Sequence, residues 1–207
     1  SLGWMNGHEM HYTIPAGFKI LALKYRETGY NCEFTGTFEC NDEFLNRYRQ
    51  KALRTLYITM RDTYMDCPDR ERAQWWGDMV NEMGEAFYAL DTRANGLAKK
   101  GILELANWQR PDHTIYSPIP AGNWDRELPM QMLNSVGYFG FWTYYLYSGD
   151  LETIRAVYPK VRNYLSIWKL GKDGLVVPRK GGWTWGDWGN NKDMTMLYNG
   201  WYYLALK

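Results

Sequence analysis

The chain has 207 residues, enough for one domain with its own hydrophobic core or for part of a larger protein. Its 24 basic and 23 acidic residues are spread evenly and leave a net charge of +1, which excludes the concentrated charge typical of proteins that bind nucleic acid or anionic membranes. No apolar run approaches the roughly 18 residues of a membrane span, so we expect neither a span nor an export signal in these residues.

Aromatic residues make up 17% of the chain, with 11 Trp and 17 Tyr. Tryptophan and tyrosine offer flat apolar faces with a polar edge, which suits the binding of sugar rings. The same side chains also dominate ordinary protein cores. Composition leaves both interpretations open, and the positions of the tryptophans must decide between them.

Cysteine and histidine are too few to organise the fold. Three cysteines do not make a disulfide framework, although a Cys32–Cys40 pair remains open, and Cys67 is expected to be a buried thiol. The histidines show no metal-ligand spacing: His8, His11 and His113. No phosphate-binding glycine loop or dinucleotide fingerprint is present, so the sequence predicts no metal and no cofactor.

The first 40 residues read as strand and loop. Residues 18–26 and 32–39 are short, partly alternating in hydrophobicity, and separated by Gly29. Such runs are typical of β-strands. We therefore expect a short β segment before the rest of the chain.

The period then changes to that of an α-helix. Apolar residues between 41 and 64 form a helical stripe, with Asn41 or Asp42 available as its N-cap. Helical patterns continue almost to the end of the sequence, at about 75–90, 92–108, 128–148, 151–169 and 195–207. The chain is therefore predicted to be mainly α.

Two of these helices differ in character. Residues 136–147 are apolar on all sides, which favours a helix enclosed by others, whereas residues 151–168 are amphipathic. A tight turn ending at Asp150, a candidate N-cap, joins them as antiparallel neighbours, and Pro159 is a candidate kink. Alternating enclosed and amphipathic helices predict two concentric layers, an α/α toroid.

Long non-helical stretches at 111–129 and 171–193 interrupt this pattern. Loops of this length in a compact domain are usually functional or disordered. They contain Trp124, Trp183, Trp185 and Trp188. This aromatic content argues against disorder, so we expect these loops to serve function.

The densest polar cluster is Asp66-Cys-Pro-Asp-Arg-Glu-Arg-Ala-Gln-Trp-Trp-Gly-Asp78. Pro68 helps to end the preceding helix, so these side chains can converge at a mouth between helices. Glycoside hydrolysis needs a protonated acid at the leaving oxygen, a second carboxylate opposite, and groups that hold the sugar hydroxyls; this cluster supplies the first and third. The alternative is a charged helix N-terminus with local salt bridges.

An acid in this cluster must keep its proton near neutrality, so its pKa must rise above the ordinary value of a glutamate. The groups expected to raise it are Trp75, Trp76, Asp66 and Asp78. Arg70 and Arg72 would lower it, so the hypothesis requires them to pair with Asp66, Asp69 or the sugar instead.

The motif Asp-Cys-Pro-x-Arg-Glu-Arg, followed by Trp75-x-Gly-Asp78, is similar to the signature of bacterial α-L-rhamnosidases of glycoside hydrolase family 78. Residues 25–30, 36–46, 146–150 and 186–188 also resemble this family, so the likeness runs from about residue 20 to the C-terminus. It implies inverting hydrolysis of terminal α-L-rhamnosides, with Glu71 as general acid. It further implies sugar contacts from Asp66, Arg70, Trp75 and Asp78.

A second cluster, residues 182–191, mixes tryptophans with an acid and two amides. In the family a tryptophan of this region lines the pocket, so Trp183 or Trp188 is predicted to stack on the sugar, with Asp187 as a hydroxyl acceptor. Trp124 is a further candidate contact. The alternative is a glycine-rich corner packed by tryptophans.

The resemblance also implies the domain organisation. Residues 1–40 would be a β segment and linker from a preceding β-sandwich domain, and residues 41–207 the N-terminal portion of an incomplete (α/α)6 barrel. The general base is then expected beyond residue 207, where the remainder of the same polypeptide would complete the barrel, and the isolated chain is expected to be inactive. Its partner would be a rhamnose-containing glycan or glycoside. The compartment stays open, because similar proteins act outside the cytoplasm or in it, with the periplasm or the outside of the cell slightly favoured.

Two other functions remain open. The same fold could act on another deoxyhexose or on a uronic acid glycoside. A homologue without the base could instead bind carbohydrate without catalysis.

Overall fold

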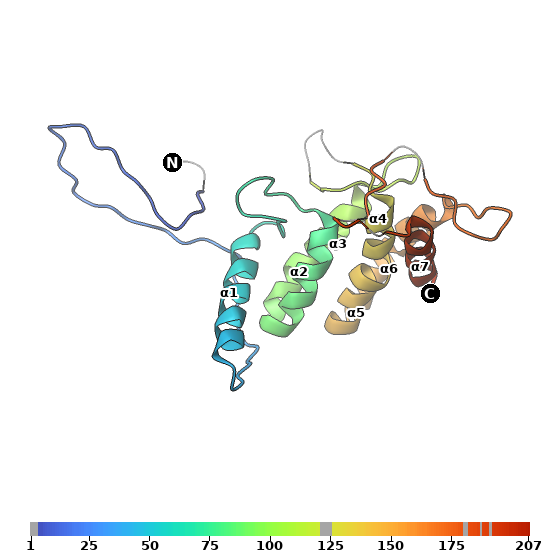
Figure 1. Cartoon of the computed structure of the whole chain (residues 1–207), viewed down its shortest axis with the longest axis horizontal. Helices are drawn as coiled ribbons and strands as arrows, with labels where there is room; N and C mark the ends of the chain where they lie inside the picture. The colour runs from blue at the N-terminus through green and yellow to red at the C-terminus, as the bar shows by residue number, and fades with distance from the viewer. Residues whose placement is uncertain (1–3, 121–125, 180–181, 187, 191) are drawn as a thin grey trace.

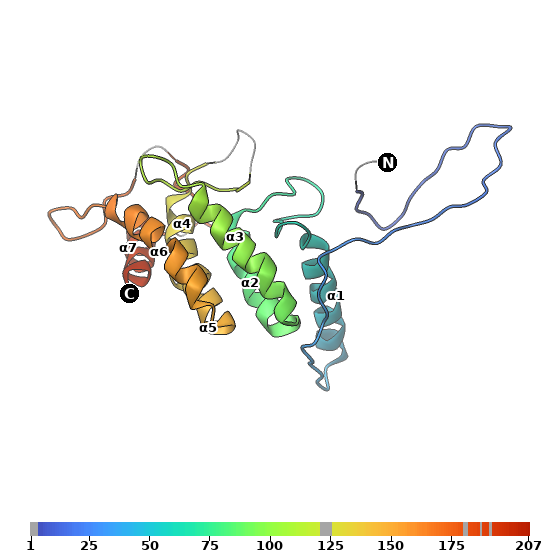
Figure 2. The same ribbon diagram turned by 180° about the vertical axis from the view of Figure 1, so that it is seen from behind.

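The computed structural model describes residues 4–120, 126–179, 182–186, 188–190 and 192–207. Its described helices lie side by side in a row, and the described parts of the connections that follow α1, α3 and α6 lie at the same ends of the helices, the upper ends in Figure 1 (Figures 1 and 2). The helices are α1 (Glu43–Thr59), α2 (Trp76–Ala89), η1 (Thr92–Ala94), α3 (Asn95–Asn107), α4 (Pro129–Val136), η2 (Tyr138–Trp142), α5 (Thr143–Ser148), α6 (Leu151–Ser166) and α7 (Met194–Leu206). None of the described helices is long and apolar enough to cross a membrane.

Every range predicted to be helical contains a helix, which confirms the mainly α interpretation. The carboxylate of Asp42 caps α1 by accepting the N–H groups of Phe44 and Leu45. Helix α6 continues through Pro159. Its predicted N-cap is also present, because the Asp150 side chain accepts the N–H of Thr153.

The predicted helix 128–148 is divided by one turn of π-helix, η2. The N–H of Trp142 donates to the carbonyl of Gly137, five residues earlier. The turn needs glycine at position 140, because a Cβ atom there would clash with the carbonyl oxygen of Ser135, only 1.7 Å away. The wide turn shifts the faces of α5 relative to α4, which periodicity alone did not predict.

The expectation that residues 136–147 are fully enclosed was wrong for the described chain. Phe141 and Tyr144 are buried, but apolar neighbours on the other side of the helix are exposed: Tyr138, Phe139, Trp142, Leu146 and Tyr147. Helix α4 packs against α2 and α7, and α5 packs against α2 and α3. The described helices therefore cover one side of this segment.

The predicted β segment was also wrong. Among the described residues, no strand forms before α1, and residues 4–40 pair through a single bridge between Phe34 and Leu90. The stretch around Val176 likewise forms only one bridge, to Leu170. An extended segment becomes a strand only when another strand satisfies its N–H and C=O groups, and none of the described segments provides one here. Cys32 and Cys40 are free thiols.

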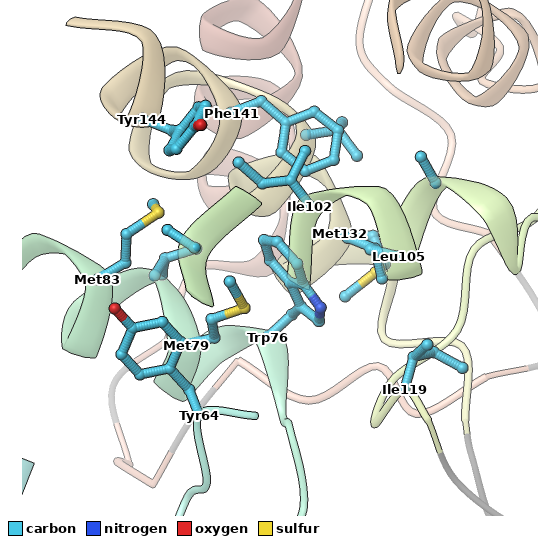
Figure 3. Packing of buried hydrophobic residues seen from close by; sticks show 14 of the residues in the cluster. Tyr64, Trp76, Met79, Met83, Ile102, Leu105, Ile119, Met132, Phe141 and Tyr144 are labelled. Carbon is cyan, nitrogen blue, oxygen red and sulfur yellow. The ribbon is translucent and has the colours of Figure 1, made fainter. Parts of the chain in front are cut away.

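The core lies between α2, α3 and α4, and it shows which tryptophans are buried by packing. Trp76 is fully buried, meets Phe141 edge to face at 5.7 Å, and lies among Met79, Ile102 and Met132 (Figure 3). Trp168 is buried as well. Some tryptophans therefore serve packing, while those at the loop end of the helices remain available for binding.

One carboxylate, Asp150, ties three helices together. It caps α6 and also accepts the hydroxyls of Thr153, at 2.6 Å, and of Tyr144 on α5, at 2.9 Å. Lys99 on α3 lies 3.1 Å from the same oxygen. These donors stabilise the ionised form and hold the pKa of Asp150 well below its ordinary value.

Replacing Asp150 by alanine should lower the free energy of unfolding by about 2 kcal/mol, because a helix cap is lost and the buried Thr153 hydroxyl loses its partner. Urea unfolding followed by circular dichroism at neutral pH measures this. Glu152→Gln, an exposed change in the first turn of the same helix, serves as the control and should cost far less. Equal midpoints for the two variants would contradict the role of Asp150.

Candidate functional site

Residues 66–75 form a compact loop between α1 and α2. The N–H of Asp66 donates to the carbonyl of Ala73 at 3.0 Å, and the N–H of Ala73 donates back to Oδ1 of Asp66 at 3.0 Å. Arg72 adopts a left-handed conformation (φ 51°) that closes the loop. These bonds return the chain to the start of α2 and present the side chains between them on one side.

The loop is fixed to its neighbours by buried polar contacts. The amide of Gln74 donates to the Ile119 carbonyl at 2.7 Å and to Oε2 of Glu104 on α3 at 3.1 Å. The N–H of Trp76 donates to the Ser117 hydroxyl at 2.9 Å. The loop therefore rests on α3 and on the segment that precedes α4.

A pocket of about 410 Å³ opens beside this loop. Its volume suits a ligand of the size of a monosaccharide or disaccharide. Three segments line it: the 66–78 loop and first turn of α2, the start of α4, and residues 183–188. The lining residues are Asp66, Arg70, Glu71, Trp75, Asp78, Leu128, Gln131, Trp183, Trp185 and Trp188.

The aromatic side of the pocket consists of tryptophans from two distant segments. Trp75 and Trp183 stack with ring centroids 6.3 Å apart and an interplanar angle of 16°. Trp185 and Trp188 meet edge to face at 5.5 Å, and Trp188 is 89% exposed. A large apolar surface left open to solvent beside polar groups is typical of a ligand-binding site.

Glu127 holds this aromatic wall in place. Its carbonyl accepts the N–H of Trp183 at 2.9 Å, and its carboxylate, 3% exposed, pairs with Nε of Arg179 at 2.7 Å. Gly182 is required beside it, because a Cβ atom there would lie 2.1 Å from the Glu127 carbonyl oxygen. A buried ion pair thus anchors a loop that otherwise lies at the surface.

Glu71 lies at the pocket with both carboxylate oxygens occupied. Nη2 of Arg70 lies 2.6 Å from Oε1, and the Cys67 thiol donates to Oε2 at 3.1 Å. Arg70 is the main reason why the pKa of Glu71 falls to about 2, with smaller contributions from Cys67 and Asp66. While Arg70 is paired with it, Glu71 is therefore a carboxylate.

This finding corrects the expected electrostatics. Arg70 pairs with Glu71 itself, and the pKa of Glu71 is lowered where a raised value was expected. Arg72 does point elsewhere, 3.9 Å from Asp69 and over the ring of Trp4. Trp76 faces the core, so it does not help to desolvate Glu71. The close contact with Arg70 lowers the pKa of Glu71 by more than burial of Glu71 raises it.

Asp66 shifts in the opposite direction. Burial raises its pKa, and the negative charge of Glu71 raises it further, while the Ala73 N–H opposes the change. Polar atoms of Asp66, Cys67 and Glu71 lie within 4.8 Å of one another. Hydrogen bonds among these groups account for that spacing, so we assign no metal ligand and no cofactor site here.

The structure brings together seven of the nine predicted site residues around one pocket: Asp66, Arg70, Glu71, Trp75, Asp78, Trp183 and Trp188. The other two, Trp124 and Asp187, lie outside the described residues. Sequence reasoning missed Leu128, Gln131 and Trp185. Leu128 and Gln131 are three residues apart at the start of α4, a spacing that places them on one helix face and could have marked them.

Comparison with known proteins agrees with the motif. A family model described as the bacterial alpha-L-rhamnosidase 6 hairpin glycosidase domain matches residues 33–200. The chain belongs to this six-hairpin glycosidase family. It is 25% identical to an alpha-L-rhamnosidase of Formosa agariphila over 170 residues, which is 72% of this chain and 17% of the relative.

Solved structures share the fold of this family domain. The GH78 rhamnosidase of Bacillus sp. GL1 superimposes with a TM-score of 0.69 at 22% identity, covering 77% of this chain and 16% of that chain. The rhamnosidase from Klebsiella oxytoca with rhamnose bound gives a TM-score of 0.63 at 18% identity, covering 83% and 33%. The chain thus spans a third or less of these proteins.

A further carboxyl, that of Glu82 on α2, is close enough to the charges of Asp66 and Asp78 for them to affect its pKa. Burial raises its pKa to about 8, and the charges of Asp78, Glu85 and Asp66 add to this, while the Thr59 hydroxyl opposes it. Its Oε2 atom is buried with no hydrogen-bond partner among the described residues. Glu82 is therefore protonated in the folded chain at neutral pH.

Because the folded pKa of Glu82 exceeds its ordinary value of 4.5, the folded state holds this proton more tightly than the unfolded state. The stability from that proton is fully present below about pH 4.5 and is lost as the pH rises towards 8, by at most about 1.4 kcal/mol per unit. Glu82→Gln should flatten this slope in urea titrations between pH 5 and 8. The exposed control Glu39→Gln, which is not among the groups that shift Glu82, should retain it, and parallel curves for wild type and Glu82→Gln would disprove the assignment.

Proposed function

We propose that this chain carries the general-acid half of an inverting α-L-rhamnosidase site, with Glu71 as the proton donor. One observation supports this most directly: the motif residues Asp66, Arg70, Glu71, Trp75 and Asp78 converge on a single pocket with exposed tryptophans opposite. The proposal takes its reaction from the family and its residue roles from the motif.

In this proposal the pocket holds a terminal sugar between its two sides. Trp183 and Trp188 stack on the apolar face of the ring, while Asp66, Arg70 and Asp78 bind its hydroxyls. Glu71 then donates a proton to the glycosidic oxygen as the bond to the leaving group breaks. The sugar expected in this site is rhamnose.

Inversion also needs a carboxylate that activates water on the far side of the ring, about 6.5–9.5 Å from the acid. The carboxylates among the described lining residues are Asp66, Glu71 and Asp78, all from the segment that carries the acid. We therefore propose that another part of the complete protein supplies the base as it completes an (α/α)6 barrel, and that residues 1–40 lead in from a β-sandwich domain.

A second candidate function is carbohydrate binding without hydrolysis. The Arg70–Glu71 ion pair favours it, since a carboxylate held ionised by an arginine cannot donate a proton. Calorimetric binding of L-rhamnose by the complete protein, without turnover of any rhamnoside, would support this function. A panel of aryl glycosides would separate rhamnose from another deoxyhexose or a uronic acid.

Glu71→Gln in the complete protein should reduce kcat by about 10²- to 10⁴-fold on a rhamnoside with a poor leaving group, because the departing oxygen loses its acid. The loss should be smaller with a good leaving group, which departs without protonation. Initial rates on alkyl and nitrophenyl rhamnosides measure this.

Asp69→Asn is the matched control. It removes an exposed carboxylate two residues from Glu71 and outside the pocket lining, so activity should stay near that of the wild type. Thermal unfolding checks that both variants are folded. Near-normal turnover by Glu71→Gln on the poor leaving group would end the assignment.

A further inference from the structure

Glu71 has three polar neighbours: Asp66 and Cys67 belong to the closed loop, whereas Arg70 reaches it with an exposed side chain. Cys67 and Asp66 approach it from the loop backbone, which the Asp66–Ala73 hydrogen bonds hold. Arg70 approaches from the pocket, and its side chain is 84% exposed against 22% for Glu71. The guanidinium can therefore leave Glu71 without uncovering any core.

We propose that Asp66 and Glu71 share one proton, and that Arg70 determines which of them holds it. While Arg70 pairs with Glu71, Asp66 holds the proton. A ligand whose hydroxyls take over the guanidinium leaves Glu71 to receive that proton. This rests on the proposed role of Glu71 as the acid and explains how an ionised residue becomes a donor when substrate binds.

The transfer is balanced within the site. The O–H bond on Asp66 breaks, an O–H bond forms on Glu71, and the charge of the pair stays at one negative unit, so no proton is exchanged with solvent. Neighbouring carboxyls titrate as a pair in this way when like charges interact closely. The pKa of Asp66 is raised by burial and that of Glu71 is lowered by Arg70, so a proton shared by the pair lies on Asp66 while Arg70 contacts Glu71.

The other titratable groups near this pair lie on the same loop or on α2. Cys67 belongs to the same loop, and Asp78 and Glu82 face it from α2. The described lining residues from the start of α4 and from 183–188 carry no charge. Arg70 is thus the lining cation whose displacement changes the balance between the two carboxyls.

A first test needs no catalytic activity. Carboxyl carbons of Asp66 and Glu71 are followed by ¹³C NMR in pH titrations of the complete protein, with Arg70→Gln as the variant. The pKa of Glu71 should rise by about one unit or more when Arg70 is removed. The control Arg72→Gln, whose guanidinium lies towards Asp69 and Trp4, should leave it unchanged. An unshifted Glu71 in Arg70→Gln would overturn the proposal.

A second test adds L-rhamnose to the wild type. Saturating sugar should shift the Glu71 resonance towards that of a protonated carboxyl and the Asp66 resonance the opposite way. Sugar that binds without changing either resonance would overturn the proposal.

A third test uses the pH profile of kcat/KM on an aryl rhamnoside. Asp66→Asn keeps an oxygen that accepts the Ala73 N–H, so the loop is preserved, but it removes the proton store. The alkaline limb should move to lower pH by about one unit or more, and the added Arg70→Gln change should move it back. If Asp66→Asn lowers activity at every pH but leaves the alkaline limb of the profile in place, Asp66 serves only to bind the sugar, and the proposal is overturned. A protein that hydrolyses nothing yet passes the NMR test would refute the proposed function alone.

Discussion

The reciprocal hydrogen bonds between Asp66 and Ala73 are the constraint on which the candidate site depends. They fold the chain back so that Trp75 and Asp78 begin α2 next to Arg70 and Glu71. Without that closure, a segment containing Pro68 and two arginines would have little reason to adopt one conformation. The buried amide of Gln74 then fixes the closed loop to α3, so the chemistry of the site rests on the helical core.

Much of the fold could be predicted because helix periodicity and capping are local signals. Asp42, one of two candidates, and Asp150 marked the starts of α1 and α6, because a carboxylate just before an apolar stripe can accept the free N–H groups of the first helical turn. The π turn at 138–142 could not be predicted, because it depends on the close approach of Gly140 to a carbonyl one turn away. The strand prediction was wrong because alternating hydrophobicity produces a strand only where a neighbouring strand is available to pair with it.

The site followed the same division. Its members could be predicted from the motif, and the pocket unites those that the structure describes. Their protonation could not, because the sequence does not show whether Arg70 or Arg72 reaches Glu71. Side-chain direction within a short loop decides that question, and with it the sign of the pKa shift. Gln131 was missed because it stands in no charged cluster, and Trp185 because the family resemblance pointed to Trp183 or Trp188 within the same segment.

The two sides of the pocket have different origins in the chain. The charged side is a short, backbone-closed loop at a helix start, whereas three of the four lining tryptophans lie on the long connection between α6 and α7, which Glu127 holds. Insertions or exchanges in that connection can reshape the exposed tryptophan surface while leaving Asp66 and Glu71 unchanged. Such a division lets the shape of the pocket change during evolution at little cost to its charged loop.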